Sequence, residues 1–190
     1  MGRSSAEQAL INRSRIVEEA SRLFRERGVD AVSVSDIMTA ARLTVGGFYK
    51  HFASKEALAE EACALSFEQA ASAWLKWSQR DESPSGAATI VENYLRKRPA
   101  QHTCPMLAYA AHASSTDSAP PTRKTYAAGV DALLSDFLAQ TGSDQNPQSH
   151  EEAQLMFAAM VGAQLLAQAS GHAAWANALK QTVVRRARQA

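Results

Sequence analysis

SVSDIMTAARLTVGGFYKHFASKE, residues 33–56, is the most informative stretch of this chain. It contains the N-terminal signals of successive short helices. Ser33 followed by Asp36 forms a capping box, in which each side chain bonds the backbone N–H of the other residue. Thr44 and Ser54 stand at the next two N-cap positions. The stretch therefore predicts two short helices joined by a tight turn, followed by the start of a third helix.

The second short helix, predicted over 45–51 after a turn at Arg42 and Leu43, has an unusual surface. Gly46 and Gly47 lie near its start, where each glycine costs about 1 kcal/mol relative to alanine inside a helix. At a helix N-terminus that faces DNA, the missing side chains allow the backbone to approach closely. Two helices joined in this way are typical of a helix-turn-helix unit, whose second helix fits a major groove about 12 Å wide.

A purely structural interpretation of the same stretch stays open. Phe48 and Phe52 are expected in the core, where they would hold the second helix against its neighbours. His51 can be a packed histidine whose hydrogen bonds are satisfied. Because hairpins of two capped helices are common, the residues taken one by one do not decide between DNA binding and a structural hairpin.

The segment before this stretch predicts a supporting helix. Residues 1–9 are polar and expected to fray. From Leu10 the apolar residues follow a helical period, and Gly28 is placed to end the helix in a left-handed cap. The buried face of this helix is expected to be formed by Ile16, Val17, Ala20, Leu23 and Phe24.

The rest of the chain predicts further helices, because apolar residues recur with a helical period between turn-forming breaks. Pro and Gly are few, at 6 and 9 of 190 residues, and 46% of the chain is hydrophobic. We therefore expect an all-α protein of about nine helices with a substantial core. A second capping box, at Ser149 and Glu152, is predicted to open one of the later helices. The later helices are predicted over 55–79, 87–98, 105–113, 120–140, 150–170 and 172–189.

Charge is distributed unevenly along the chain. Residues 1–55 carry nine Lys and Arg against six Asp and Glu, a net charge of +3 in a chain whose total is +1. This asymmetry suits an N-terminal module that meets phosphate. Cys63 and Cys104 are too few for a disulfide framework, which indicates a reducing compartment. Because there is neither a signal-peptide pattern nor an apolar run of about 18 residues, a cytoplasmic protein is expected.

Enzyme chemistry is not predicted. The five histidines are scattered, and no HExxH, CxxC, GxSxG or phosphate-loop pattern occurs. His102 and Cys104 offer at most two metal ligands, so neither a metal site nor a cofactor is predicted.

Cys104 lies in the segment HTCP, residues 102–105, at a predicted helix N-terminus. The helix dipole and the cationic residues Lys97 and Arg98 upstream favour a lowered thiol pKa. One hypothesis is therefore that Cys104 is a reactive sensor thiol. The alternative is a small buried hydrophobic side chain at a helix start, which is the commoner role of a cysteine outside disulfides.

Residues 13–61 resemble the N-terminal domain of the TetR/AcrR family of transcriptional regulators. The resemblance rests on RIVEEASRLFRERGVDAVSVSDIMTAA, residues 15–41, and LTVGGFYKHFASKEAL, residues 43–58. It covers about a quarter of the chain, and the remainder agrees only in length and in the expected number of helices. Its most specific part is the arrangement of Phe48, Tyr49, His51, Phe52, Lys55 and Glu56 after the helix end at Gly28.

The resemblance implies a dimeric, nine-helix repressor whose helix-turn-helix at 33–51 binds a palindromic operator. It implies a DNA-binding domain over 1–54 and an effector-binding and dimerisation domain over 55–190, which pairs through about 149–188. The small residues of the predicted helix at 150–170 suit close helix packing, either in such a dimer or in the core of one chain. Binding of a small-molecule effector is expected to release the DNA.

The resemblance also implies DNA contacts. The family usually has Gly where this chain has Arg42, and often a polar residue where it has Val45. We expect Arg42 to add a phosphate contact and Val45 to make an apolar one, for example to a thymine methyl group. Lys55 is expected to touch phosphate. The predicted DNA contacts are Ser33, Arg42, Thr44, Val45, Gly47, Tyr49, Lys50, His51 and Lys55.

An apolar effector pocket between the middle helices is implied in the same way. Each of its predicted lining residues is equally interpretable as core. Two alternatives stay open: an electrophile or redox sensor that acts through Cys104, and a helical small-molecule-binding protein with weak DNA binding. The predicted pocket residues are Phe67, Trp74, Tyr94, Cys104, Met106, Tyr109, Tyr126 and Phe157.

Overall fold

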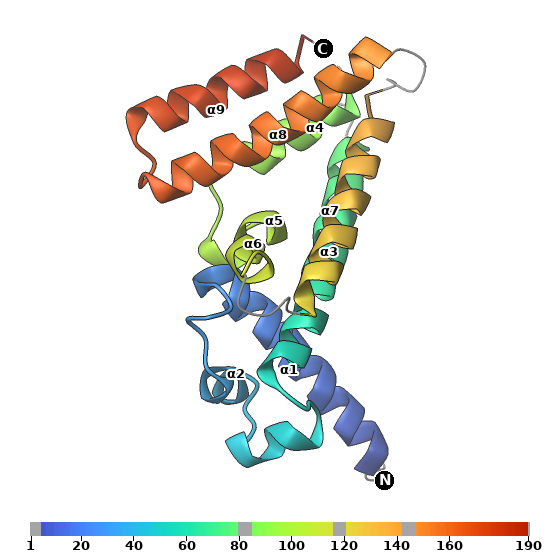
Figure 1. Cartoon of the computed structure of the whole chain (residues 1–190), viewed down its shortest axis with the longest axis vertical. Coiled ribbons are helices and arrows are strands. Elements are labelled where there is room, and N and C mark those ends of the chain that lie inside the picture. The colour runs from blue at the N-terminus through green and yellow to red at the C-terminus, as the bar shows by residue number, and fades with distance from the viewer. Residues whose placement is uncertain (1–4, 80–84, 116–120, 142–146, 190) are drawn as a thin grey trace. The chain divides into compact units, whose positions relative to one another are not determined.

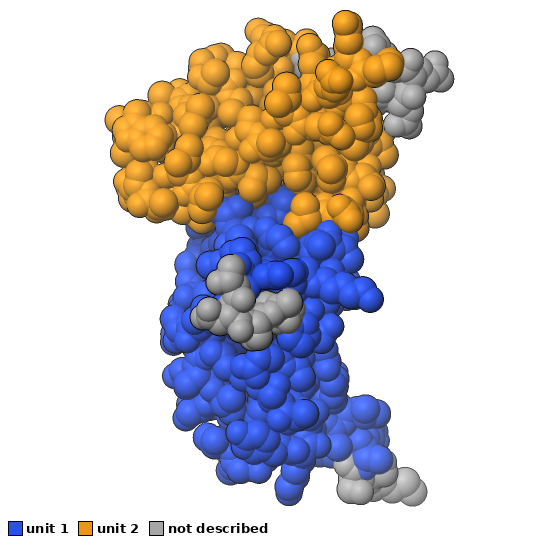
Figure 2. All heavy atoms as spheres, in the orientation of Figure 1, with its two compact units in different colours: residues 1–68, 98–129 blue, residues 69–97, 130–190 orange. Residues whose placement is uncertain are grey.

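The computed structural model describes residues 5–79, 85–115, 121–141 and 147–189. Regular structure in these ranges is helical, and no strand occurs in them. The predicted all-α class is confirmed. Figure 2 shows two compact units in different colours, each formed by two separate segments of the chain.

The first unit comprises residues 1–68 and 98–129. Its elements are α1 (Ser5–Arg27), α2 (Val34–Ala40), the 3-10 helix η1 (Val45–Lys50), the first part of α3 (Lys55–Ser78), the 3-10 helix η2 (Ala100–His102), α5 (Pro105–Ala108), α6 (Ala110–Ala113) and the first part of α7 (Thr122–Ala139). α1 packs against α2, η2 and α5, and α2 packs against η1.

The second unit comprises residues 69–97 and 130–190. It contains α4 (Gly86–Leu95), α8 (Pro147–Ala169) and α9 (Ala174–Ala187), together with the later parts of α3 and α7. α9 packs along α8, and α4 contacts both of them (Figure 1). These three helices pack against one another, and a groove between α4 and α9 is described below.

The core of the first unit is organised along α1. Ile16 and Phe24 are fully buried on the face that the helical period predicted. A buried polar cluster lies beside them, in which Ser66 Oγ is 2.8 Å from Ser21 Oγ and 3.1 Å from the Tyr109 hydroxyl. Because these hydroxyls satisfy one another, the cluster joins α1, α3 and Tyr109 without leaving a buried hydroxyl unpaired.

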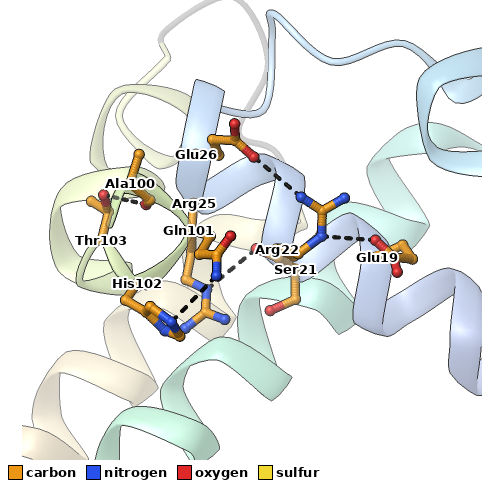
Figure 3. A network of polar contacts seen from close by, with 9 residues as sticks. All are labelled: Glu19, Ser21, Arg22, Arg25, Glu26, Ala100, Gln101, His102 and Thr103. Atoms are coloured by element: carbon orange, nitrogen blue, oxygen red, sulfur yellow. Dashed lines mark hydrogen bonds and ion pairs between the residues drawn. The ribbon is translucent and has the colours of Figure 1, made fainter. Parts of the chain in front are cut away.

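A network of polar contacts follows the C-terminal half of α1, close to η2 (Figure 3). The Arg22 guanidinium donates to Glu19 at 2.8 Å and to Glu26 at 3.2 Å on the same helix. Arg25 Nε donates to the backbone carbonyl of Ser21 at 3.4 Å. η2 was not predicted from the sequence, because three residues carry no periodic signal.

The ends of α1 are in part as predicted. α1 begins at Ser5, so the expectation of a frayed segment is wrong for residues 5–9. Glu7 lies in the first turn, where its charge complements the positive end of the helix dipole. Residues 1–4 lie outside the described residues. Gly28 ends the helix with φ of +82°, which confirms the predicted left-handed cap.

The helix predicted over 87–98 is shorter at its C-terminus. α4 ends at Leu95, and the backbone of Arg96 is extended, with ψ of 147°. Three consecutive cations precede Pro99, and a proline disfavours helical geometry in the residue before it. The cationic end of the predicted helix is therefore an extended connection to η2.

Two other helix predictions need correction. The helix predicted over 105–113 is interrupted at Tyr109, whose φ of −103° and ψ of −6° separate α5 from α6. The Tyr109 ring is fully buried, so tertiary packing overrides the continuous helical pattern at this point. The predicted cap at Ser149 is also wrong, because α8 already begins at Pro147, and proline is favoured in a first helical turn.

The last turn of α8 ends as expected at Gly171, which has φ of +61°. The final helix begins at Ala174 rather than at His172, because His172 also has a positive φ, of 60°. The predicted break at 81–86 lies mostly outside the described residues, as does Pro120, the predicted start of the helix observed as α7.

None of the described helices is both long and apolar enough to cross a lipid bilayer. Within the described part of the chain, no three His, Cys, Asp or Glu side chains come together as a possible metal site. Cys63 and Cys104 are both thiols rather than a disulfide.

Candidate nucleic-acid interface

α1 is fastened to the helix-turn-helix by Arg13. Its Nη2 donates to Glu61 Oε1 on α3 at 2.5 Å. The same guanidinium lies over the ring of Phe52, with its carbon 4.6 Å from the ring centre. One side chain of α1 thus contacts both Phe52, just after η1, and the second turn of α3.

The start of α2 is fixed by the predicted capping box. Asp36 N–H donates to Ser33 Oγ at 3.1 Å, and Ser33 N–H donates to Asp36 Oδ2 at 2.9 Å. The Ser33 hydroxyl also donates to Asp36 Oδ2 at 2.6 Å. These bonds, led by the one from the Ser33 side chain, lower the pKa of Asp36. The Ser33 hydroxyl is therefore already engaged in the cap.

The turn after α2 contains a left-handed residue. Arg42 has φ of +57°, which is uncommon for a residue with a side chain. Its N–H donates to the carbonyl of Thr39 at 3.0 Å, and the N–H of Leu43 donates to the carbonyl of Met38 at 2.8 Å. This geometry explains why a glycine suits this position, and in this chain it leaves the Arg42 side chain exposed.

The second helix of the pair is a 3-10 helix, η1, rather than the expected α-helix over 45–51. Thr44 occupies its N-cap position, but its side chain makes no capping hydrogen bond. Phe48 is fully buried on the inner side and stacks against Phe52, with ring centres 5.7 Å apart. The predicted core role of these two rings is confirmed.

The outer side of η1 is exposed. Tyr49 is 74% exposed and Val45 is 47% exposed. The Tyr49 ring meets Phe48 edge-on at 5.2 Å, which positions its phenol without burying it. A side chain added at Gly46 would meet nothing within 4 Å, and one at Gly47 would make ordinary contacts with Thr44 and Met38. The glycines are therefore not required by packing within this chain.

The beginning of α3 completes this surface. Ala57 N–H donates to Ser54 Oγ at 3.1 Å, which confirms the predicted cap. Hydrogen bonds from its own backbone N–H and from Ser54 lower the pKa of Glu56. The cap leaves Lys55 half-buried at the first position of the helix.

The predicted DNA contacts are gathered on this one part of the first unit. Ser33, Arg42, Thr44, Val45, Tyr49 and Lys50 are exposed, whereas Gly47, His51 and Lys55 are half-buried. We refer to these nine residues as the reading surface. Nothing in the arrangement tests which of them touches DNA, so the assignment stays a prediction.

Several of the predicted effector residues of the first unit contact one another. Phe67 meets Tyr126 edge-on at 5.7 Å, and the Tyr126 hydroxyl donates to the carbonyl of Met106 at 2.8 Å. A side chain at Gly129 would lie only 2.3 Å from the Phe67 ring, so this glycine is required by that ring. Tyr109 is fully buried nearby in the hydroxyl cluster.

The predicted effector residues of the second unit form a separate aromatic cluster. Trp74 meets Tyr94 at 6.0 Å and Phe157 at 6.1 Å between ring centres. Phe137, which was not predicted for the pocket, lies 6.4 Å from Trp74 and 5.8 Å from Phe157. All four rings are buried, so the role of these side chains in ligand binding stays a prediction beside their role in the core.

The two thiols differ in their surroundings. Cys63 is fully buried, and desolvation raises its pKa to about 12. Cys104 is half-buried at the N-cap position of α5. Burial lowers the pKa of Arg25, and charges at Tyr109 and Cys104 oppose this shift, so a cation lies within electrostatic reach of Cys104.

Sequence reasoning missed Arg13 as a structural support of the reading surface. Its partners, Phe52 and Glu61, lie 39 and 48 residues further along the chain, so no local pattern links them. A cation on the otherwise apolar-facing side of α1 was the only available signal.

Comparison with known proteins agrees with this geometry. Residues 16–62 match the family described as bacterial regulatory proteins, tetR family. The chain is 47% identical over 45 residues to the HTH-type transcriptional repressor DhaR of Mycobacterium sp. (strain GP1), a match that covers 24% of this chain and 23% of that protein. It is 41% identical over 56 residues to the repressor KstR2 of Mycobacterium tuberculosis, covering 30% and 28%. The chain thus spans only about a quarter of the length of these curated relatives.

Similarity to solved structures extends over nearly the whole chain. A TetR transcriptional regulator from Chloroflexus aurantiacus superposes with a TM-score of 0.72 at 25% identity, covering 94% of this chain and 95% of that one. A TetR-family regulator from Cytophaga hutchinsonii gives a TM-score of 0.74 at 20% identity, with 95% and 94% covered. Residues 16–62 thus carry the sequence pattern of the tetR family, and the chain shares the fold of solved TetR-family regulators along nearly its whole length.

Proposed function

We propose that this protein is a ligand-responsive transcriptional regulator that binds a palindromic DNA operator as a homodimer. The single observation that carries the proposal is the arrangement at η1, where Tyr49 and Lys50 are exposed while the adjacent Phe48 is fully buried. A rigid buried ring system beneath an exposed aromatic and cationic pair is what a recognition element needs, because its contacts must be positioned before DNA binds.

The proposed contacts fall into two classes. Arg42, Lys50 and Lys55 supply cations for phosphates, which fix the position of a protein on DNA without reading its sequence. Tyr49 and the hydroxyl of Thr44, which makes no capping hydrogen bond, are proposed to contact base edges. Val45 is proposed to contact a thymine methyl group. Gly47 keeps the backbone of η1 free to approach the groove.

The proposed dimer uses the exposed apolar residues of the second unit. Leu155, Leu165 and Leu166 on α8 are 45–70% exposed, and Trp175 and Leu179 on α9 are 55% and 37% exposed. Large apolar side chains grouped on two adjacent helices are typical of a protein interface. A symmetric pair would place two reading surfaces on one operator, as the symmetry of palindromic half-sites requires.

Effector binding is proposed to act on α3. This helix begins at Lys55 in the reading surface and continues to Ser78, past Phe67 and Trp74. A ligand that displaces either ring would change the preferred position of a helix that is covalently continuous with the DNA contacts. Such a ligand shifts the equilibrium only as far as it binds one helix position better than the other.

The proposed function is tested by footprinting on DNA upstream of the protein's own gene. A dimer predicts two protected half-sites of related sequence, with centres separated by about 34 Å or a multiple of this helical repeat. A single protected site without a second half-site would contradict the proposed operator recognition. So would the absence of protection at protein concentrations low enough to avoid non-specific binding.

A further inference from the structure

A surface groove lies between the C-terminal end of α4 and one side of α9, entirely within the second unit. Its volume is about 660 Å³, far more than an inorganic ion occupies. The groove is lined by Glu92, Leu95, Arg96, Lys97, Asn177, Lys180, Gln181, Val184 and Arg185.

The charge of this groove is strongly positive. Four cations line it, namely Arg96, Lys97, Lys180 and Arg185, against the single carboxylate of Glu92. That carboxylate is already bound by Arg188 through an ion pair of 2.5 Å. The carboxylate of Glu92 is therefore shared between Arg188 and the nearby Arg96, and the four groove cations exceed it in charge.

Lys180 is the decisive residue, because most of its side chain is buried although it carries a charge. It is only 8% exposed, on the same side of α9 as the buried residues Ala176 and Val183. Its ammonium makes no hydrogen bond or ion pair with any residue in the described ranges. Desolvation lowers the pKa of Lys180, as expected for a cation without a partner.

A lysine with a largely buried side chain and no counter-ion is costly, since its charge has lost part of its hydration without gaining a partner. Leucine or methionine would fill the same space on α9 without that cost. An anion in the groove would supply the missing partner, and the neighbouring Arg96, Lys97 and Arg185 would share its charge.

The other lining residues indicate what kind of anion fits. Leu95 is buried and Val184 is half-buried, so both present apolar surface beside the cations. Asn177 and Gln181 are exposed and add amide groups to the lining, although Asn177 Nδ2 already donates to the carbonyl of His172 at 2.8 Å. Charge, apolar floor and volume together suit a small organic molecule rather than a bare inorganic ion.

We propose that the α4–α9 groove binds a small organic anion, a phosphate or carboxylate attached to an apolar group, with Lys180 as its central ligand. The site differs from the reading surface and from the aromatic clusters, and the proposal does not depend on operator binding. Because successive residues of a helix are rotated by about 100°, the groove side of α9 also lies away from the exposed Trp175 and Leu179. A dimer through those two residues leaves the groove accessible.

Thermal unfolding and calorimetric titration of the full chain test the proposal with phenyl phosphate and benzoate, which carry the two candidate groups on the same ring. Sodium chloride at equal ionic strength controls for general screening. We expect at least one of the two anions to raise the unfolding temperature above that control. Lys180→Met should weaken its binding about tenfold or more, as expected for loss of a charge-assisted hydrogen bond.

Arg186→Gln is the matched control, because it removes one exposed cation from α9 outside the groove. It should leave the dissociation constant of the anion unchanged. Without added anion, Lys180→Met should unfold at a higher temperature than the wild type, because it removes a partly desolvated charge that has no counter-ion. If Lys180→Met fails to fold, the exposed-site variant Lys97→Gln replaces it and should weaken the anion severalfold.

Two results would overturn the proposal. The first is that neither anion exceeds the sodium chloride control; if the variants then weaken binding of duplex DNA, the groove is assigned to nucleic acid. The second is that Lys180→Met, or Lys97→Gln in its place, binds the anion as tightly as the wild type does.

Discussion

The guanidinium carbon of Arg13 lies 4.6 Å from the centre of the Phe52 ring, so a cation of α1 covers an aromatic residue that is itself stacked on Phe48. The same guanidinium is paired with Glu61 on α3. The position of the reading surface therefore depends on more than η1. It also depends on the contacts of Arg13 on α1 with Phe52, before the start of α3, and with Glu61, within α3.

Arg13→Ala is expected to lower the free energy of unfolding by about 1 kcal/mol, because it removes a cation–π contact and a partly exposed ion pair, each worth up to about 1 kcal/mol. Urea unfolding followed by circular dichroism measures the change. Arg15→Ala removes an exposed cation from the same helix and should have no measurable effect. Equal stability of the two variants would show that the Arg13 contacts do not support the fold.

Gly47→Ala should preserve the fold but weaken DNA binding. The added methyl group meets only ordinary contacts in the free protein, and the φ of Gly47 is not positive, so neither strain nor a clash is introduced. Any loss of DNA affinity would therefore come from a clash between the added methyl group and the DNA, not from a change in the protein. Gly28→Ala is the opposite control, because its φ of +82° predicts a loss of stability of about 1 kcal/mol. If Gly47→Ala binds DNA as tightly as the wild type, Gly47 does not lie in the DNA interface.

The capping box predicts a defined dependence of stability on pH. Because hydrogen bonds from Ser33 lower the pKa of Asp36 in the folded state, the ionised form contributes stability above the unfolded pKa of about 3.9. That contribution is lost as the pH falls through the lower, folded pKa. The stability difference between wild type and Asp36→Ala should be present at neutral pH and vanish in strong acid. A difference that stays constant through the acid range would mean that the cap does not depend on ionisation.

The two cysteines should react at different rates. The raised pKa of about 12 and the full burial of Cys63 make it inert in the folded protein. Cys104 is half-buried and lies within electrostatic reach of Arg25, so a thiol reagent should label it first. Mass spectrometry of the native protein after brief alkylation measures this order. Unchanged operator affinity after complete labelling of Cys104 would exclude the hypothesis of a sensor thiol.

Leu179→Glu should dissociate the proposed dimer, because it places a charge on the exposed apolar side of α9. Analytical ultracentrifugation measures the oligomeric state. Leu75→Glu is the matched control, since Leu75 is 56% exposed on α3, outside the proposed α8–α9 interface. A wild-type protein that sediments as a monomer at all concentrations would contradict the dimer.

The sequence was informative where local rules determine the structure. The capping box at Ser33, the cap at Ser54 and the left-handed ends at Gly28 and Gly171 follow from short-range hydrogen bonding and backbone sterics. These features were predictable because their partners lie within a few residues. The caps at Ser33 and Ser54 flank the helix-turn-helix, so the same short-range signals mark that unit in the sequence.

The features missed by sequence reasoning depend on distant partners. The break between α5 and α6 follows from the burial of Tyr109 against Ser66, 43 residues away. Arg13 likewise contacts a residue distant in the sequence, and the groove at Lys180 is formed jointly with residues from α4. The 3-10 geometry of η1 was not predictable either, because a six-residue apolar pattern with two glycines does not distinguish it from one turn of α-helix.

The central claim, that the exposed residues of η1 recognise DNA, is tested most directly by the affinity of Tyr49→Ala and Lys50→Ala for the footprinted DNA over a range of salt concentrations. Both side chains are exposed, so neither change should alter the fold. Each variant should lose about 1–3 kcal/mol of binding free energy, and Lys50→Ala should also reduce the salt slope by about 0.9 if its ammonium neutralises a phosphate. Lys124→Ala, an exposed lysine of α7, should behave as the wild type. If Tyr49→Ala and Lys50→Ala bind the DNA as tightly as Lys124→Ala does, the assignment of η1 as the recognition element is wrong.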